Sequence, residues 1–260
     1  MLLEVEKLEV VYHHVATAVQ GVSLGVPERA IVALLGTNGA GETTMLRAIS
    51  GFLGADDAGI TDGRVTFLGR VVNGLPPHAL AREGLVHVPE RDKVFETLSV
   101  EDNLGALVPG TRPGPGRDVV FDLFPVLATR RRQLAGYLSG GERQMLAIGA
   151  ALLCRPVVLL IDELSLGLAP LVVENLMQLV LRLRNELGLA VLLVEQNVGA
   201  ALEIADHGYV MEHGRVVYDG TPERLLAHED IQEFYLGVGK DVERKSYGDV
   251  KQYRRRRRWF

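Results

Sequence analysis

The sequence predicts an α/β protein whose core is a largely parallel β-sheet covered by helices. Short apolar or β-branched runs recur along the chain with helical stretches between them, at 30–36, 63–69, 85–90, 157–163 and 190–196. Several runs lack the alternation of polar and apolar residues that a half-exposed strand shows, so we expect strands buried on both faces. Strands that alternate with helices in this way favour parallel pairing.

Size and composition narrow the class further. The 260 residues, 47% of them hydrophobic, suit a globular chain with a sizeable core. The net charge of -5 argues against nucleic acid as a partner. The single cysteine, Cys154, cannot form an internal disulfide and so favours a reducing compartment. No apolar run approaches the ~20 residues of a membrane span, and the acidic N-terminus does not resemble a signal peptide.

The first run leads into a glycine-rich loop, LLGTNGAGETT at 34–44. Glycines between a strand and a helix direct backbone N–H groups toward phosphate oxygens. The P-loop pattern G-x-x-x-x-G-K-[ST] has lysine where this chain has Glu42, so a glycine-rich turn without a ligand is the alternative. We expect Thr43 to offer its hydroxyl to Mg²⁺. The candidate phosphate-binding residues are Gly36, Thr37, Asn38, Gly39, Ala40, Gly41, Glu42, Thr43 and Thr44.

The middle of the chain predicts a helical insert between the strands at 85–90 and 157–161. A helix begins in LSVEDNL, where Ser99 and Asp102 have roughly the spacing of a capping box. Residues 105–117 hold four glycines and three prolines and predict a loop. Helical signal follows at 118–135 and 141–154.

Two further motifs carry polar chemistry. The run VVLLIDE ends in Asp162 and Glu163, at the edge of a parallel sheet where ligands bind. Asp162 suits Mg²⁺, and Glu163 suits activation of a water that attacks the γ-phosphate. In LSGGERQ, Ser139 and two glycines precede a helix and predict a second anion site at its N-terminus. An ordinary helix cap is the alternative reading of that motif.

The C-terminal part predicts a β-hairpin, a helix and a basic tail. Two short runs flank His213-Gly214 within 207–220. Thr221 and Pro222 suit the N-cap and first position of a helix over 221–237. From Lys240 to Phe260 the chain has nine basic and three acidic residues and ends in RRRRRWF. This tail could bind anionic lipid, remain solvated, or dock on a partner subunit.

With LSGG lying between the two phosphate-site motifs, residues 3 to 237 resemble the ATP-binding cassette (ABC) family. The resemblance implies a P-loop NTPase-type cassette with a mostly parallel core sheet, an antiparallel β subdomain and a helical subdomain. The nucleotide-binding domain would cover 1–237, with its core at 1–87 and 156–237 and the helical insert at about 88–155. The basic tail would be 238–260.

The resemblance also implies roles for single residues. Two cassettes of this family sandwich two ATP molecules, so the signature residues would contact the ATP of a partner; they are Ser139, Gly140, Gly141 and Glu142. Glu90 takes the place of the Q-loop glutamine, as a catalytic and metal-binding residue, and Gln196 takes the place of the switch histidine. Tyr12 is the candidate for stacking on adenine, with His13 as the alternative.

The phrases VPER, LSLGLAP and LLVEQN are similar to the ATPases of branched-chain amino-acid importers. This similarity implies an ATPase that uses ATP and Mg²⁺, sits peripherally on the cytoplasmic face of the membrane, and contacts no nucleic acid. Its implied partners are a second cassette, as a homo- or heterodimer, separate membrane permease subunits and, indirectly, a substrate-binding protein.

Glu42 keeps two other functions open. A carboxylate repels polyphosphate where a lysine attracts it, and unit charges ~4 Å apart interact by ~4 kcal/mol at an effective dielectric near 20. The chain could therefore be a hydrolysis-deficient structural partner that lends its signature to a competent cassette. Glu42 could equally be a recent or engineered replacement. A soluble ABC ATPase of translation or repair is less favoured, because the chain has neither a second cassette nor a coiled-coil interruption.

Overall fold

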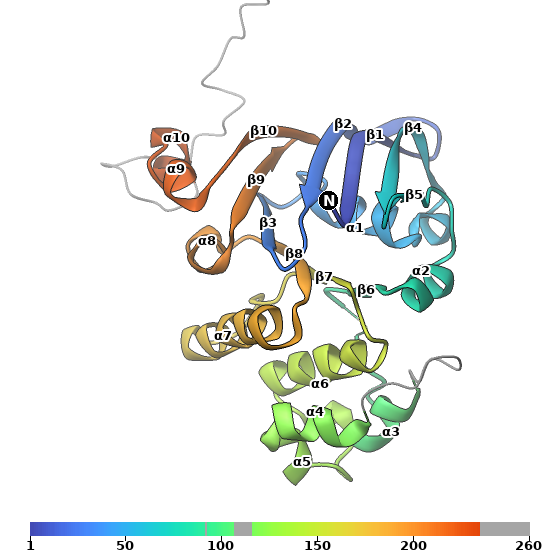
Figure 1. Ribbon diagram of the computed structural model, residues 1–260, viewed down its shortest axis with the longest axis vertical. Helices are drawn as coiled ribbons and strands as arrows, with labels where there is room; N and C mark the ends of the chain where they lie inside the picture. The colour runs from blue at the N-terminus through green and yellow to red at the C-terminus, as the bar shows by residue number, and fades with distance from the viewer. Residues whose placement is uncertain (92, 107–115, 235–260) are drawn as a thin grey trace, which may run out of the picture.

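The computed structural model describes residues 1–91, 93–106 and 116–234, which form two sheets and a group of helices (Figure 1). The larger sheet has the order β10-β9-β3-β8-β7-β6. Its strands are β3 (Ile31–Gly36), β6 (Leu85–Val88), β7 (Val158–Asp162), β8 (Ala190–Glu195), β9 (His207–Glu212) and β10 (Arg215–Gly220). Only the β9–β10 pair is antiparallel within this sheet, which confirms both the mostly parallel core and the hairpin around His213-Gly214.

The smaller sheet is antiparallel and has the order β2-β1-β4-β5. It consists of β1 (Leu3–Tyr12), β2 (Ala16–Val26), β4 (Ala58–Phe67) and β5 (Arg70–Val71). The run at 63–69, predicted among the parallel core strands, belongs instead to β4 in this sheet. Val65 and Phe67 are buried while Arg64 and Thr66 are only partly buried or exposed, so β4 has one buried face and one outer face, as antiparallel strands often do.

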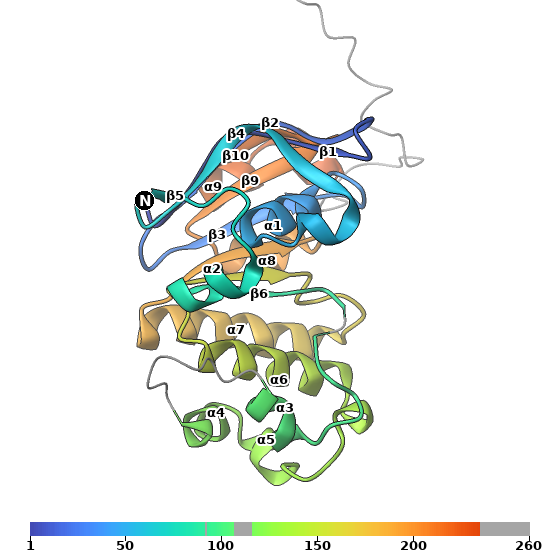
Figure 2. The same cartoon turned by 90° about the vertical axis from the view of Figure 1, so that its right-hand side faces the viewer.

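Helices α3 (Val100–Ala106), α4 (Arg117–Leu123), α5 (Pro125–Thr129) and α6 (Gly140–Leu153) gather at the end opposite the antiparallel sheet (Figure 2). The Asp102 N–H donates to the Ser99 hydroxyl at 3.1 Å, so Ser99 caps α3 as predicted. The helical stretch predicted at 118–135 is interrupted, because Pro125 lacks an N–H and begins a new helix. Most of the predicted loop at 105–117 lies outside the described residues.

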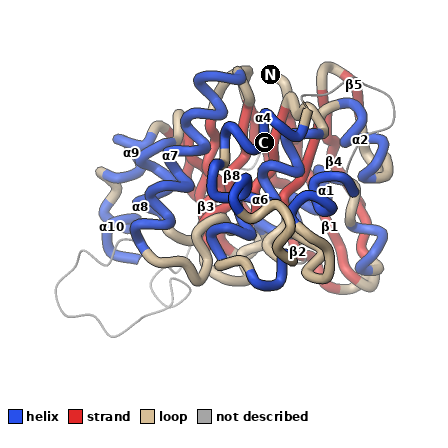
Figure 3. The backbone as a smooth tube through the Cα atoms, turned by 90° about the horizontal axis from the view of Figure 1, so that it is seen from below, coloured by secondary structure: helices blue, strands red, loops and turns tan. Residues whose placement is uncertain are grey.

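The remaining helices flank the sheets. Seen from the helical end, α8 (Val198–Ile204), α9 (Pro222–Leu226) and α10 (Glu229–Phe234) lie on one side and α2 (Pro77–Glu83) on the other (Figure 3). Pro222 occupies the first position of α9 as predicted, but Thr221 makes no side-chain capping bond. The single helix predicted over 221–237 is two short helices. The Gln232 amide donates to the Leu226 carbonyl at 2.8 Å and satisfies a helix-end acceptor.

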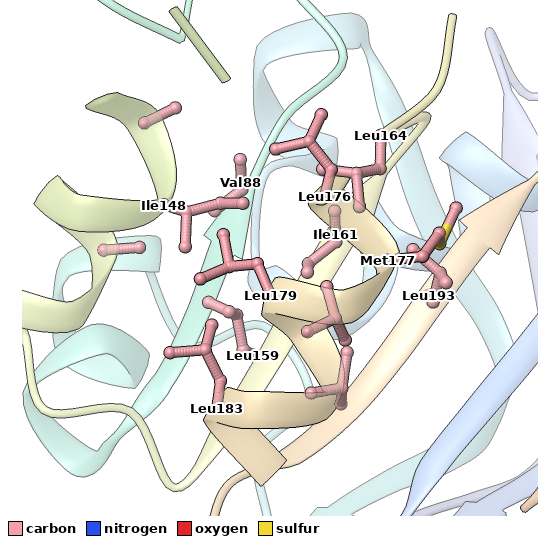
Figure 4. Close-up of a cluster of buried hydrophobic side chains, with 14 of the residues drawn as sticks. Val88, Ile148, Leu159, Ile161, Leu164, Leu176, Met177, Leu179, Leu183 and Leu193 are labelled. Carbon is pink, nitrogen blue, oxygen red and sulfur yellow. The ribbon is translucent and has the colours of Figure 1, made fainter. Parts of the chain in front are cut away.

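Two cores lie on opposite faces of the parallel sheet. One lies among β6, β7, β8, α6 and α7 (Pro170–Leu187), where Leu159 lies beside Leu179 and Leu183, and Leu193 lies beside Met177 (Figure 4). The other surrounds α1 (Glu42–Ser50), which lies between the two sheets (Figure 2). The start of α1 is thereby held at the carboxyl end of β3. No helix among the described residues is long and apolar enough to cross a membrane, and the basic tail lies outside them.

Candidate nucleotide site

The glycine-rich loop joins β3 to α1 and owes its shape to two glycines in the left-handed region. Gly39 has φ +86° and Gly41 has φ +110°, which residues with a β-carbon rarely adopt. A β-carbon on Gly41 would also lie 2.7 Å from the Ala18 carbonyl oxygen. The loop borders an open pocket of about 450 Å³. Its lining includes Ala18, Gly39, Gly41, Glu42, Thr43 and Thr44.

Glu42 folds back into this loop. The residue is only 8% exposed, and an ideal β-carbon on Gly36 would lie 1.8 Å from its Oε1 atom. The pKa of Glu42 is raised to about 7, mainly by burial; the charges of Glu163 and Asp162 contribute to the rise, and the backbone N–H groups of Glu42 and Gly41 oppose it. A buried carboxyl therefore lies at the base of the phosphate-binding loop.

Thr43 and Asp162 lie next to each other. The Thr43 hydroxyl donates to the Asp162 Oδ1 atom at 3.4 Å, across from α1 to the end of β7. Asp162 is 1% exposed, and burial raises its pKa to about 6 against the effect of the Thr43 hydrogen bond. The two residues present a hydroxyl and a carboxylate oxygen side by side, which are the hard donors that Mg²⁺ prefers.

Glu163 and Gln196 also meet, and Asn38 joins them. The Gln196 Nε2 atom donates to Glu163 Oε1 at 2.8 Å and to Asn38 Oδ1 at 2.6 Å. Glu163 adopts φ +53°, a left-handed backbone that surrounding contacts must hold. Burial raises the pKa of Glu163, and the neighbouring Glu90 charge adds to the rise. Gln196, which follows β8, thus links Glu163 to Asn38 of the glycine-rich loop through its side-chain amide, a group that does not ionise.

Glu90 lies close enough for its charge to raise the pKa of both Asp162 and Glu163. Its carboxylate pairs with Arg91 at 3.1 Å. Lys93, which no sequence motif singles out, donates to the side-chain oxygen of Gln144 in α6. Burial lowers the pKa of Lys93. In the sequence, Lys93 ends the stretch VPERDK, but no local pattern there indicates that its side chain faces the site.

The signature residues form the N-terminus of α6, whereas the glycine-rich loop precedes α1. Ser139 caps α6 in a complete capping box, with Ser139 N–H to Glu142 Oε2 at 2.8 Å and Glu142 N–H to Ser139 Oγ at 3.3 Å. A β-carbon on Gly140 would lie 2.8 Å from Leu168, and one on Gly141 would lie 2.5 Å from Val172. The glycines therefore let the start of α6 closely approach Leu168 and the first turn of α7. Gly140 lines a separate pocket of about 410 Å³ together with Glu90, Lys93 and Glu163.

Tyr12, the predicted adenine contact, lies at the end of β1 beside helix α1. Its hydroxyl lies 3.2 Å from the Thr44 Oγ1 atom. His13, the alternative, follows in a tight turn in which both His13 and His14 have positive φ and the Val15 N–H bonds the Tyr12 carbonyl at 2.9 Å. The structure thus brings Tyr12 to the start of α1.

Comparisons with known proteins agree with this geometry. The ABC transporter family model matches residues 19–165. The high-affinity branched-chain amino acid transport ATP-binding protein BraG of Pseudomonas aeruginosa is 40% identical over 239 residues, which cover 91% of this chain and all of BraG. The probable branched-chain amino acid transport ATP-binding protein LivF of Archaeoglobus fulgidus is 39% identical, over 84% of this chain and 91% of LivF.

Solved structures give the same fold. The ADP conformation of the ABC transporter cassette MJ1267 has a TM-score of 0.77 and 26% identity, covering 91% of this chain and 98% of that one. A nucleotide-free ABC transporter cassette has a TM-score of 0.78 and 25% identity, covering 92% and 99%. The chain therefore belongs to the ABC transporter family, as an ATP-binding cassette of the ATPase type.

Proposed function

We propose that this chain is the ATP-binding and ATP-hydrolysing subunit of an importer for branched-chain or related amino acids. The observation that carries the proposal is the similarity to BraG, which extends over that protein's whole length. LivF supports the same substrate class at 39% identity. The lipopolysaccharide export protein LptB of Escherichia coli is less similar, at 32%.

The site supports ATP chemistry. Residues 36–44 would hold the phosphates through backbone N–H groups, and Tyr12 would contact the adenine. Thr43 and Asp162 would hold a Mg²⁺ ion, with the Glu90 carboxylate near them, and the bound ion would neutralise phosphate charge. Among the described residues no group of three His, Cys, Asp or Glu side chains could hold a metal by itself, which agrees with a site that nucleotide completes.

Glu163 is proposed to accept a proton from the attacking water. Its raised pKa keeps it a stronger base than an exposed carboxylate, and Gln196 orients it. Ser139 to Glu142 would contact the ATP of a second cassette.

The contact with the membrane permease is proposed at an apolar pocket of about 410 Å³ between α2, β6 and α6. Phe52 and Phe95, which line it, are 45% and 54% exposed. Large apolar side chains left exposed on one surface mark interaction sites. Binding there would place the chain peripherally at the cytoplasmic face of the membrane. We expect Phe95→Asp to weaken copurification with the permease and to leave ATP binding unchanged.

The buried Glu42 carboxyl favours a second candidate, a cassette that binds a competent partner and hydrolyses little ATP at its own site. One experiment separates the two. The chain is copurified with candidate membrane permease subunits and reconstituted in vesicles, and uptake of leucine, isoleucine and valine is compared with uptake of lysine. ATP-dependent leucine uptake that Glu163→Gln abolishes supports the first candidate. Uptake that survives Glu163→Gln but needs a second cassette supports the other, and absence of uptake of all three contradicts the importer proposal.

A further inference from the structure

Glu195, the last residue of β8, has a buried carboxylate that the proposed chemistry does not use. The residue is 1% exposed. Its Oε1 atom accepts the Ser165 N–H at 2.9 Å, and its Oε2 atom accepts the Ser165 hydroxyl at 2.5 Å. The Leu164 N–H also favours its charged form, although burial raises the pKa of Glu195 to about 7. All of these donors come from one loop, the segment 164–168 that follows Glu163.

The end of β8 contacts Glu163 and the segment that follows it through three successive residues. The Val194 carbonyl accepts the Glu163 N–H at 3.1 Å, and Gln196 donates to the Glu163 carboxylate at 2.8 Å. Glu195 binds the residues just beyond. Glu163 has φ +53°, so its backbone depends on contacts on both sides to keep its conformation.

We propose that Glu195 is a positioning residue for hydrolysis: it holds the 164–168 segment on β8 and thereby keeps Glu163 aligned with Gln196 and Asn38. The inference rests on the proposed role of Glu163. A carboxylate suits this task because several donors converge on it and because it has two acceptor oxygens and no donor when ionised. The segment is tied on its other side to α6, where the Gln144 amide donates to the Leu164 carbonyl at 3.4 Å. Glu195 and Gln144 therefore bind the segment from two sides.

A purely structural role would be the alternative, since a buried acceptor also stabilises the end of a strand. The two roles differ in what they protect. Loss of a positioning residue lowers the turnover number and leaves the affinity for ATP unchanged, and this loss has no effect once Glu163 has been replaced. Loss of a structural residue lowers the stability of the fold and changes the affinity for ATP and the turnover number together, whichever residue stands at position 163.

The test uses Glu195→Ala, Glu195→Gln and Ser165→Ala in the full chain, with Asp206→Ala, which removes a more exposed carboxylate, as the control. Asp206 accepts the Ile31 N–H at 2.8 Å at the amino end of β3, the strand beside β8. Amide hydrogen exchange of the 162–168 peptide is measured first, without turnover. ATP hydrolysis is then measured for the chain as it exists and in the Glu42→Lys background.

We expect Glu195→Ala to speed exchange in 162–168 at least tenfold and to lower kcat at least tenfold, with KM for ATP within twofold. Ser165→Ala should give a smaller loss in the same direction. Glu195→Gln should recover most of both, because its amide oxygen still accepts the Ser165 N–H. In a Glu163→Gln background, Glu195→Ala should lower the residual rate no further. Asp206→Ala should change neither readout.

Faster exchange with unchanged kcat would show that Glu195 only caps the strand, and an additive loss in the Glu163→Gln background would overturn the proposal equally. Unchanged amide exchange of the 162–168 peptide in Glu195→Ala would show that Glu195 does not hold the 164–168 segment on β8. Failure of the proposed function reads differently: Glu163→Gln would then retain full hydrolysis, while the exchange result at 162–168 would stand.

Discussion

The carboxyl group of Glu42 lies against the α-carbon of Gly36, inside the loop that this family uses to hold phosphate. A β-carbon at Gly36 would come within 1.8 Å of the Glu42 Oε1 atom. The side chain thus places negative charge, and also volume, at the base of the loop. The surrounding residues remain in order, since Thr43 meets Asp162 and Gln196 meets Glu163. The departure from the P-loop pattern is thus confined to one side chain.

Glu42→Lys is expected to increase both ATP affinity and hydrolysis over a hundredfold. It removes a repulsion from polyphosphate and adds a cation, and a gain of ~3 kcal/mol corresponds to that factor. Calorimetric titration with ATP and a phosphate-release assay measure it. Glu28→Lys, an equal charge change in the exposed turn before β3, is the control. Equal binding by the original chain and the Glu42→Lys variant would contradict the charge argument.

Glu42→Gln is expected to stabilise the fold increasingly as pH rises. The pKa of Glu42 is about 7 in the folded chain against an ordinary 4.5, so the folded state binds its proton more tightly than the unfolded state. The stability that this proton confers is present in full below about pH 4.5 and is lost as pH rises through 7. Urea unfolding should show the variant close to the original at pH 5 and about 2–3 kcal/mol more stable at pH 8. A difference independent of pH would be inconsistent with a buried ionising Glu42.

Glu163→Gln, combined with Glu42→Lys, is expected to trap an ATP-bound dimer. Glutamine keeps the shape of Glu163 and its place beside Gln196 but cannot accept the proton of water. Gel filtration with light scattering in ATP should show the dimer, while phosphate release falls at least a hundredfold. The single variant Glu42→Lys serves as the control that hydrolyses and dissociates. Unchanged hydrolysis in the double variant would remove Glu163 from its proposed role.

Gly141→Ala is expected to lower the free energy of unfolding by about 1–3 kcal/mol, because its β-carbon would lie 2.5 Å from the Val172 Cγ1 atom. Adding Val172→Ala should restore most of this loss by making room. Gly59→Ala is the control, since a β-carbon there meets no atom within 4 Å. Denaturant unfolding separates this packing effect from any loss of nucleotide contact. Failure of Val172→Ala to rescue Gly141→Ala would show that the close approach is not limiting.

Local patterns in the sequence sufficed for much of the fold and for naming the candidate site residues. The glycine-rich loop, the Asp162–Glu163 pair and the Ser139 cap are decided by residues within a few positions of one another, because turns and helix ends are satisfied by neighbouring backbone groups. The buried strands of the parallel sheet were equally readable from their continuous apolar runs. The hairpin around His213-Gly214 follows from turn chemistry of the same short range.

Tertiary structure decided what depends on distant partners. The assignment of β4 to the antiparallel sheet required its pairing with β1, and the helix predicted over 221–237 divides where Gln232 reaches back to Leu226. The bridge from Gln196 to Asn38 joins residues 158 positions apart. The direction of the Glu42 side chain, its raised pKa and the clamp of Glu195 on Ser165 all arise from burial. Desolvation and packing depend on every element that closes around a group, and a sequence pattern of a few residues contains only the nearest of them.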